Sequence, residues 1–188
     1  MKTKSALSLI GFFAVAALIY FLTLEKERYR RSEVSYQVPP VTLLNQHAEP
    51  VLLPDFLHST KPLMLEFIFT SCTTLCPNQS VLFANFQNKL DNPQQVQLLS
   101  ITVDPETDTP EVLRNYLERY QAKPGWDFLT GTKAEIKQVM TAFDIKPSDM
   151  ITLESSLLLR APKTGQWSKI DGQLTGRDFL HEYQRLQQ

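Results

Sequence analysis

The chain has 188 residues, which is enough for one globular domain of ordinary size and a short appendage. Two of its 19 Lys and Arg residues, Lys2 and Lys4, precede Leu24. The part beyond Leu24 therefore carries 17 of them against 20 Asp and Glu, a net charge of about −3 with neutral histidines. No basic stripe indicates a nucleic-acid partner.

The first 24 residues predict a membrane anchor. Residues 5–24 form a run of twenty without a charge, about the length that an α-helix needs to cross the hydrocarbon core of a bilayer. A cleaved signal peptide is the alternative, but the run is long for one, and no small-x-small cleavage site separates it from the charged residues 25–31. We therefore expect an uncleaved anchor over 1–24 and a polar juxtamembrane linker over 25–38.

Residues 39–188 show strands that alternate with helices. Val41–Leu44 and Val51–Leu53 predict a hairpin, and the nearly continuous apolar run Pro62–Thr70 predicts a strand covered on both faces, as in parallel sheets. The later elements are a helix after Pro77 to about Leu90, a strand at Val96–Val103, a helix at Pro110–Tyr120 capped by Asp108 or Thr109, a strand at Trp126–Leu129, a helix from the capping box Thr132–Glu135 to about Phe143, strands at Ser156–Arg160 and Gln166–Ile170, and a helix from Thr175 to about Leu186. This order predicts a thioredoxin-like α/β fold.

The only two cysteines, Cys72 and Cys76, lie where the central strand passes into a helix. If the second half of this CxxxC motif is the first turn of the helix, both cysteines share one helix face about 5–6 Å apart, within the Cα range of a disulfide. Ligands in open α/β sheets gather beyond the carboxyl ends of the strands, where Cys72 lies. A helix start also favours the thiolate. The pair therefore predicts redox or soft-metal chemistry.

Two structural interpretations compete with that prediction. A disulfide closing a loop of about five residues would stabilise the fold by only about 2 kcal/mol before strain. Alternatively, the cysteines could be buried and act as small apolar residues. The neighbours Ser71, Thr73 and Thr74 are polar, which favours a reachable site.

The other candidate ligands have simpler interpretations. Turn chemistry and helix capping account for the acidic segment Asp104–Asp108. The histidines His47, His58 and His181 are expected at the surface. Core or loop positions are expected for Met140 and Met150, and core or rim positions for Trp126 and Trp167.

Three segments together resemble the SCO/SenC family of membrane-anchored, thioredoxin-like proteins. They are Phe67–Pro77 with its CxxxCP motif, Thr102–Pro110 with DPxxDTP, and Trp126–Gly131 with WxFLTG. The resemblance covers nearly the whole domain 39–188. It implies copper delivery to, or thiol reduction in, the copper site of a respiratory cytochrome oxidase, with Cys72 and Cys76 as the copper-binding or redox-active pair.

The chain departs from the family pattern at one ligand. In the family a histidine before a late strand completes the copper site, whereas Thr152–Leu159 contains none, and Glu154 or Leu153 takes its place. Glu154 could offer an oxygen, although a carboxylate suits copper(I) poorly beside two thiolates.

Two hypotheses therefore remain, and they leave open whether the protein is an enzyme. The first is a copper-binding accessory protein that holds the ion transiently. The second is a thiol–disulfide oxidoreductase that acts on partner cysteines without stable copper binding. The expected partner is the copper-site subunit of the oxidase or another periplasmic cysteine protein.

The orientation in the membrane is predicted from conflicting signals. Two lysines precede the span and four basic residues follow it within 25–31, which favours a cytoplasmic domain by the positive-inside rule. A cysteine pair that cycles or holds copper is most useful in an oxidising compartment. We expect a single-pass protein of the inner membrane with its domain on the periplasmic side.

Overall fold

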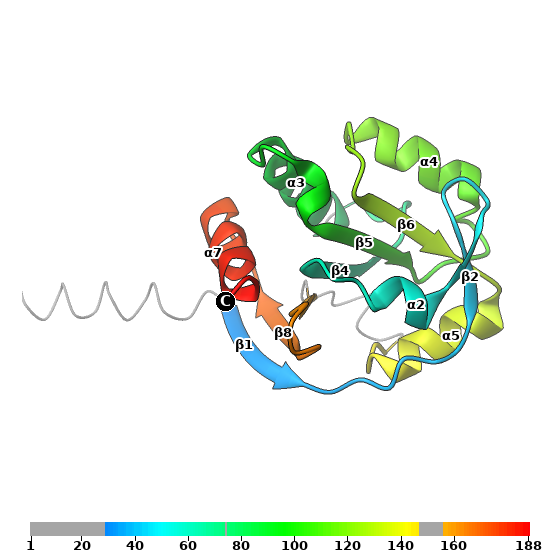
Figure 1. Ribbon diagram of the computed structural model, residues 1–188. Coiled ribbons are helices and arrows are strands. Elements are labelled where there is room, and N and C mark those ends of the chain that lie inside the picture. The colour runs from blue at the N-terminus through cyan, green and yellow to red at the C-terminus, as the bar shows by residue number, and fades with distance from the viewer. Residues whose placement is uncertain (1–28, 74, 147–155) are drawn as a thin grey trace, which may run out of the picture.

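In the computed structural model, which describes residues 29–73, 75–146 and 156–188, the core of the molecule is a mixed sheet (Figure 1). Its eight strands run in the order β1-β8-β7-β4-β5-β6-β2-β3. The strands are β1 (Tyr29–Val34), β2 (Thr42–Asn45), β3 (Pro50–Leu52), β4 (Leu63–Ile68), β5 (Gln97–Thr102), β6 (Trp126–Thr130), β7 (Ser156–Arg160) and β8 (Trp167–Gly172). The helices are α2 (Leu53–Leu57), α3 (Leu75–Asn88), the short 3-10 helix η1 (Pro93–Gln95), α4 (Pro110–Arg119), α5 (Lys133–Ala142) and α7 (Gly176–Leu186).

The three central strands are parallel. Strand β5 pairs with β4 on one side and with β6 on the other, and β7 continues the sheet antiparallel to β4. All six residues of β4 are buried, because apolar side chains cover both faces of this strand. The carboxyl ends of β4 and β5 therefore lie at one edge of the sheet, and the two cysteines follow β4 there.

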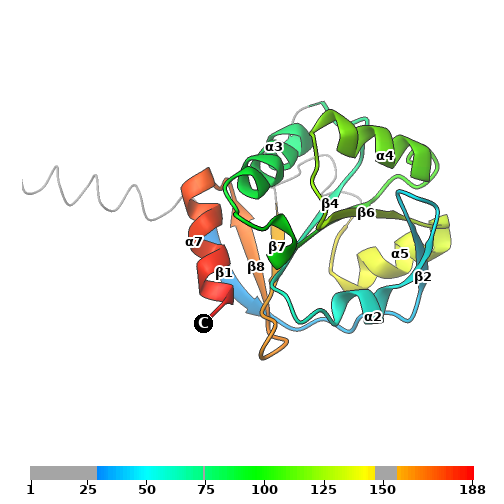
Figure 2. The same cartoon turned by 45° about the horizontal axis from the view of Figure 1, so that its top comes forward.

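Helices cover the sheet on both faces (Figure 2). Apolar residues of α3, α4 and α7 pack with Met64 and Ile68 of β4 in one buried cluster. Those of α2 and α5 pack with Leu63, Leu65 and Phe67 in a second cluster on the opposite face. The alternation along β4 is the period of two that a strand imposes on its side chains. These layers confirm the predicted thioredoxin-like α/β arrangement.

The helix starts follow the predicted capping chemistry. Thr109, not Asp108, caps α4, with its side chain accepting from the backbone N–H of Val112 and with Pro110 in the first turn. Capping boxes open α5 at Thr132 and Glu135, and α7 at Thr175 and Asp178.

Two elements differ from the sequence prediction. Residues 29–34, assigned above to a linker, form β1, which pairs antiparallel with β8 at the edge of the sheet. The short helix α2 directly follows β3, where no helix was predicted. The sequence YRRSEV of β1 has no apolar alternation, and α2, with five residues, is too short to show a helical period.

Within the residues that the structure describes, no helix has the length and apolarity needed to cross a membrane. The expected span 5–24 lies outside them.

Candidate functional site

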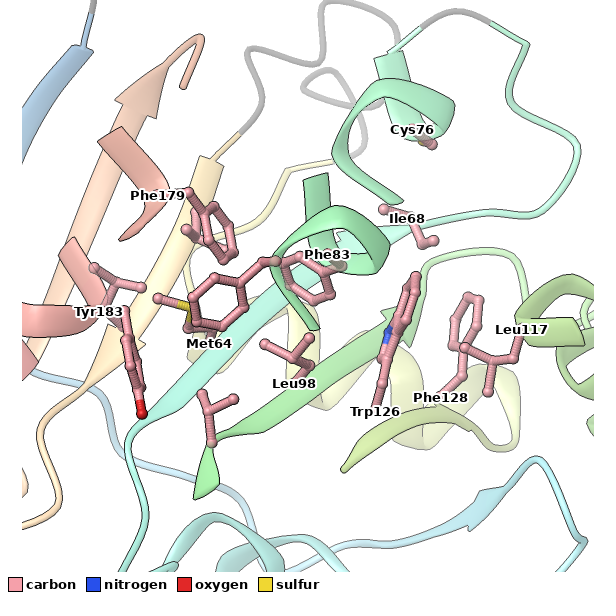
Figure 3. Close-up of a cluster of buried hydrophobic side chains, with 14 of the residues drawn as sticks. Met64, Ile68, Cys76, Phe83, Leu98, Leu117, Trp126, Phe128, Phe179 and Tyr183 are labelled. Carbon is pink, nitrogen blue, oxygen red and sulfur yellow. The ribbon is translucent and has the colours of Figure 1, made fainter. Parts of the chain in front are cut away.

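The cysteine pair lies just beyond the carboxyl end of β4. Cys72 is partly exposed in the turn before α3, and its backbone N–H donates to the carbonyl of Phe69 over 3.2 Å. Cys76 belongs to the first turn of α3 and is only 3% exposed. Figure 3 shows Cys76 above Ile68, over the end of the strand. Because α3 begins at Leu75, the two cysteines do not share a helix face as expected. A turn and a helix start bring them together instead.

The two thiols are chemically unequal. The pKa of the Cys76 thiol is raised to about 12, chiefly by burial and next by a hydrogen bond with Cys72, while a hydrogen bond with the Phe69 backbone acts in the opposite direction. The expectation that the helix start favours a thiolate is therefore wrong for Cys76, since desolvation outweighs it. The expected polar, reachable site exists only on the Cys72 side. Both cysteines are thiols in this structure.

A buried carboxylate fixes the turn that carries Cys72. Asp108 is fully buried and accepts hydrogen bonds from the backbone N–H of Thr70 at 3.1 Å, from the Thr70 hydroxyl, and from the hydroxyl of Thr102 at 2.6 Å. It thereby ties the residues before Cys72 to the end of β5. The sequence assigned Asp108 to capping and turn chemistry, because nothing in a local pattern reveals a bond to a residue 38 positions away.

The remaining candidates lie away from the cysteines or outside the described residues. The three histidines are exposed, Met140 belongs to the core on the α5 face, and both tryptophans are buried, as predicted. Glu154 and Met150 lie outside the described residues. In the described part of the chain, no group of three or more His, Cys, Asp or Glu is arranged to hold a metal ion. The cysteine thiols in that part of the chain are those of Cys72 and Cys76.

Sequence reasoning missed one ionisable residue near the pair. Glu66 lies in β4 on the face of Met64 and Ile68, and its side chain is 0% exposed. A single glutamate within an apolar strand was the available signal. The pKa of Glu66 is raised to about 8, because burial outweighs the lowering effect of the hydrogen bond from Ser100.

Sequence comparisons find that this chain is similar to proteins of one family. A model of the SCO1/SenC family matches residues 30–156. The SCO1 protein homologue of Bacillus subtilis is 32% identical over 141 residues, which cover 70% of this chain and 72% of that protein. The mitochondrial SCO1 homologue of Homo sapiens is 30% identical over 125 residues, which cover 65% of this chain and 40% of the human protein.

Solved structures give the same result for the fold. One of them is BsSco, a member of the Sco family of cytochrome c oxidase assembly proteins in which a disulfide switch was identified. Its structure matches with a TM-score of 0.65 and 29% sequence identity, and the match covers 82% of this chain and 95% of the BsSco chain. Yeast Sco1 with copper bound has a TM-score of 0.63 at 22% identity and covers 81% of this chain and 92% of its own. The likeness to the yeast protein concerns the fold alone.

Proposed function

Because this chain belongs to the SCO1/SenC family, we propose that it is a copper-binding accessory protein for assembly of the copper site of a respiratory cytochrome oxidase. The observation that carries the proposal is the pair of thiols at the carboxyl edge of β4, one partly exposed and one buried. Thiolates are soft ligands that select copper(I). Cys72 and Cys76 hold the ion, and it passes to the partner by exchange of ligands at the exposed side.

Copper binding at this pair is coupled to proton release. A metal binds the thiolate form of cysteine, and burial strongly favours the thiol form of Cys76. The ion's positive charge offsets the desolvated thiolate, so the metal-bound pair can be buried where the metal-free thiolate cannot. Affinity for copper is therefore expected to rise with pH.

An anaerobic copper(I) titration of the reduced full-length protein in mild detergent tests this function. The wild type is expected to bind one equivalent tightly, and Cys72→Ser and Cys76→Ser to lose that binding. Thr73→Ala, next to the site without a thiol, is the control. Glu154→Gln is expected to keep its affinity because a carboxylate is a poor ligand for copper(I). Equal copper uptake by a variant without both cysteines would refute the proposal.

The membrane anchor belongs to the same proposal. The uncharged run 5–24 supports a single span in the inner membrane, and the cysteine pair supports a periplasmic position for the domain. Cysteine-specific labelling of intact cells with a membrane-impermeant maleimide tests both points. Labelling of Cys72 in intact cells supports the periplasmic side. Labelling only after lysis places the domain in the cytoplasm, as the flanking charges predict.

A second function, thiol–disulfide exchange with a partner protein, is favoured by the inequality of the two thiols. The partly exposed Cys72 attacks a partner disulfide, and the buried Cys76 resolves the mixed disulfide. The absence of a histidine from 147–155 also fits a pair that needs no third ligand. Exchange that persists in metal-free protein would distinguish this function from copper delivery.

A further inference from the structure

Strand β1 begins at the edge of the sheet that carries the cysteines, which is the edge at the carboxyl end of β4. One row of paired residues crosses the sheet from β4 through β7 and β8 to β1: Glu66, Leu157, Ile170 and Arg31. Strand β4 runs from this row toward Cys72, whereas β1 runs into the row from Tyr29. Tyr29 and the turn that carries Cys72 therefore lie on the same side of the row, at the cysteine edge.

The start of β1 and the cysteine turn are close enough to share one surface. Three strand spacings of about 4.8 Å separate β1 from β4, about 15 Å in all. The sheet twists between the two strands, yet the starts of α3 and α7 lie on the same, upper side of the molecule in Figure 2. Helix α3 begins between the two cysteines, and α7 begins shortly after Gly172, the residue that pairs with Tyr29.

The link between the expected membrane span and β1 is short. The uncharged run ends at Leu24, and residues 25–28 stand between it and Tyr29. An extended chain covers at most about 3.6 Å per residue, so the five steps from Leu24 to Tyr29 cover at most about 18 Å. The headgroup layer takes up at least about 5 Å of that length. With the proposed anchor in place, Tyr29 therefore lies within about 13 Å of the bilayer surface.

The reverse orientation of the domain needs a longer link. If the opposite edge of the sheet faced the bilayer, Tyr29 would stand farther from it than Val34 by the length of β1, about 17 Å. The turn between β7 and β8 extends farther still, because Val34 pairs with Trp167, where β8 begins. This height exceeds the reach of about 13 Å that the link leaves above the headgroups. The link therefore excludes an orientation in which the cysteine edge points away from the membrane.

The charges on this side of the domain suit lipid headgroups. Residues 67–88, which include both cysteines, carry no charge. Three exposed basic residues lie around the starts of β1 and α7: Arg30, Lys89 and Arg177. Of the acidic residues beside them, Asp171 pairs with Arg30, and Asp178 closes the capping box of α7. Exposed basic residues close to a membrane are attracted to anionic lipids.

We propose that the anchor and its short link hold the cysteine edge of the sheet toward the bilayer, with the lipid headgroups as the surface that this edge faces. The proposal rests on the membrane anchor of the proposed function and adds an orientation to it. In this orientation Cys72 meets copper sites or cysteines of partner proteins that lie close to the surface of the same membrane.

Fluorescence quenching in vesicles tests this orientation. Full-length Cys76→Ser carries a fluorophore on Cys72, and the vesicles contain neutral and anionic phospholipids, some with a nitroxide quencher on the headgroup. The matched control carries the fluorophore on Lys61→Cys in a chain without the native cysteines, because Lys61 is exposed just before the opposite end of β4. The length of β4, about 20 Å, separates the two positions, so the label on Cys72 should be quenched at least about twofold more strongly.

A longer link tests whether the link itself sets the orientation. A flexible spacer of about twenty Gly and Ser residues after Arg28 lets the domain turn, so the difference between the two labels should shrink. Equal quenching of the two labels with the native link, or stronger quenching at Lys61→Cys, would overturn the proposal. A difference that the spacer leaves unchanged would also overturn it.

The outcomes separate this proposal from the proposed function. Protein that does not float with the vesicles would overturn the orientation together with the anchor. A failed copper titration with unequal quenching would refute copper binding and leave the orientation supported, because the quenching requires no metal.

Discussion

Asp108 shows how one residue positions the cysteine turn from another part of the chain. Its carboxylate receives three hydrogen bonds from Thr70 and Thr102 inside the core. Hydrogen bonds to charged groups are stronger than those between neutral groups. Asp108 therefore holds the segment before Cys72 against the end of β5, and the two family segments that contain Cys72 and Asp108 meet at this contact.

Replacing Asp108 by Asn is expected to lower the free energy of unfolding by about 2 kcal/mol, because the amide keeps one acceptor oxygen but turns an N–H₂ toward donors. Urea denaturation monitored by tryptophan fluorescence measures the change. Glu106→Gln in the same loop is the control, since Glu106 is exposed and its ion pair with Lys133 is worth under about 1 kcal/mol. Equal stability of the two variants would contradict the role given to Asp108.

The sequence located the cysteines and the strand before them, but not the inequality of the two thiols. Spacing along the chain identifies Cys72 and Cys76 as a pair. The burial of Cys76 depends on its packing with Ile68 and with apolar side chains of α3 in one cluster. That packing exists only in the folded protein. The same holds for Glu66, whose position within an apolar run was visible in the sequence, while its bond to Ser100 in the core was not.

Strand β1 joins the region after the expected membrane span to the sheet. It pairs with β8 along its whole length. Tyr29 and Arg31 also bond to the buried carboxylate of Glu182 on α7. Most elements could be predicted because their apolar residues repeat with a period of two or near 3.6. Strand β1 could not, because its sequence YRRSEV has no such period and its partners lie about 140 residues away.

Removing the side chain of Arg31 is expected to weaken the contact between β1 and α7. Arg31→Ala leaves the buried Glu182 with Arg185 and Tyr29 only, so the free energy of unfolding should fall by about 2 kcal/mol. Arg30→Ala is the control, because the Arg30 side chain is 82% exposed and its contact with Asp171 should contribute under about 1 kcal/mol. Hydrogen exchange should show faster opening of β1 in Arg31→Ala alone, and equal exchange in both variants would refute the role of this contact.

At the scale of the whole molecule, the cysteine site and the stability of the fold are linked through the core on the α3 side. The cluster that contains Cys76 also holds β4, α4 and α7 together. Glu66 lies in β4 with its side chain fully buried, and its Oε2 has no hydrogen-bond partner among the residues that the structure describes. A residue that serves stability alone would be apolar here, so the fold keeps an ionisable group at a cost in stability that depends on pH.

The direction in which this cost changes with pH follows from the pKa of Glu66. The pKa of Glu66 rises from 4.5 to about 8 on folding, so the folded state holds a proton that the unfolded state has lost between these values. The contribution of Glu66 to stability is therefore most favourable below about pH 4.5 and declines as the pH rises to about 8. Within that window the slope is at most about 1.4 kcal/mol per pH unit.

Glu66→Gln should remove this slope, since the amide does not titrate and can still accept from Ser100. The difference in unfolding free energy between the variant and the wild type is expected to shift in favour of the variant from pH 5 to pH 8.5. Urea denaturation at several pH values measures it, and taking the difference cancels the titration of groups common to both proteins. A difference that does not change with pH would contradict this role of Glu66, because it would mean that Glu66 is already ionised in the folded protein at pH 5.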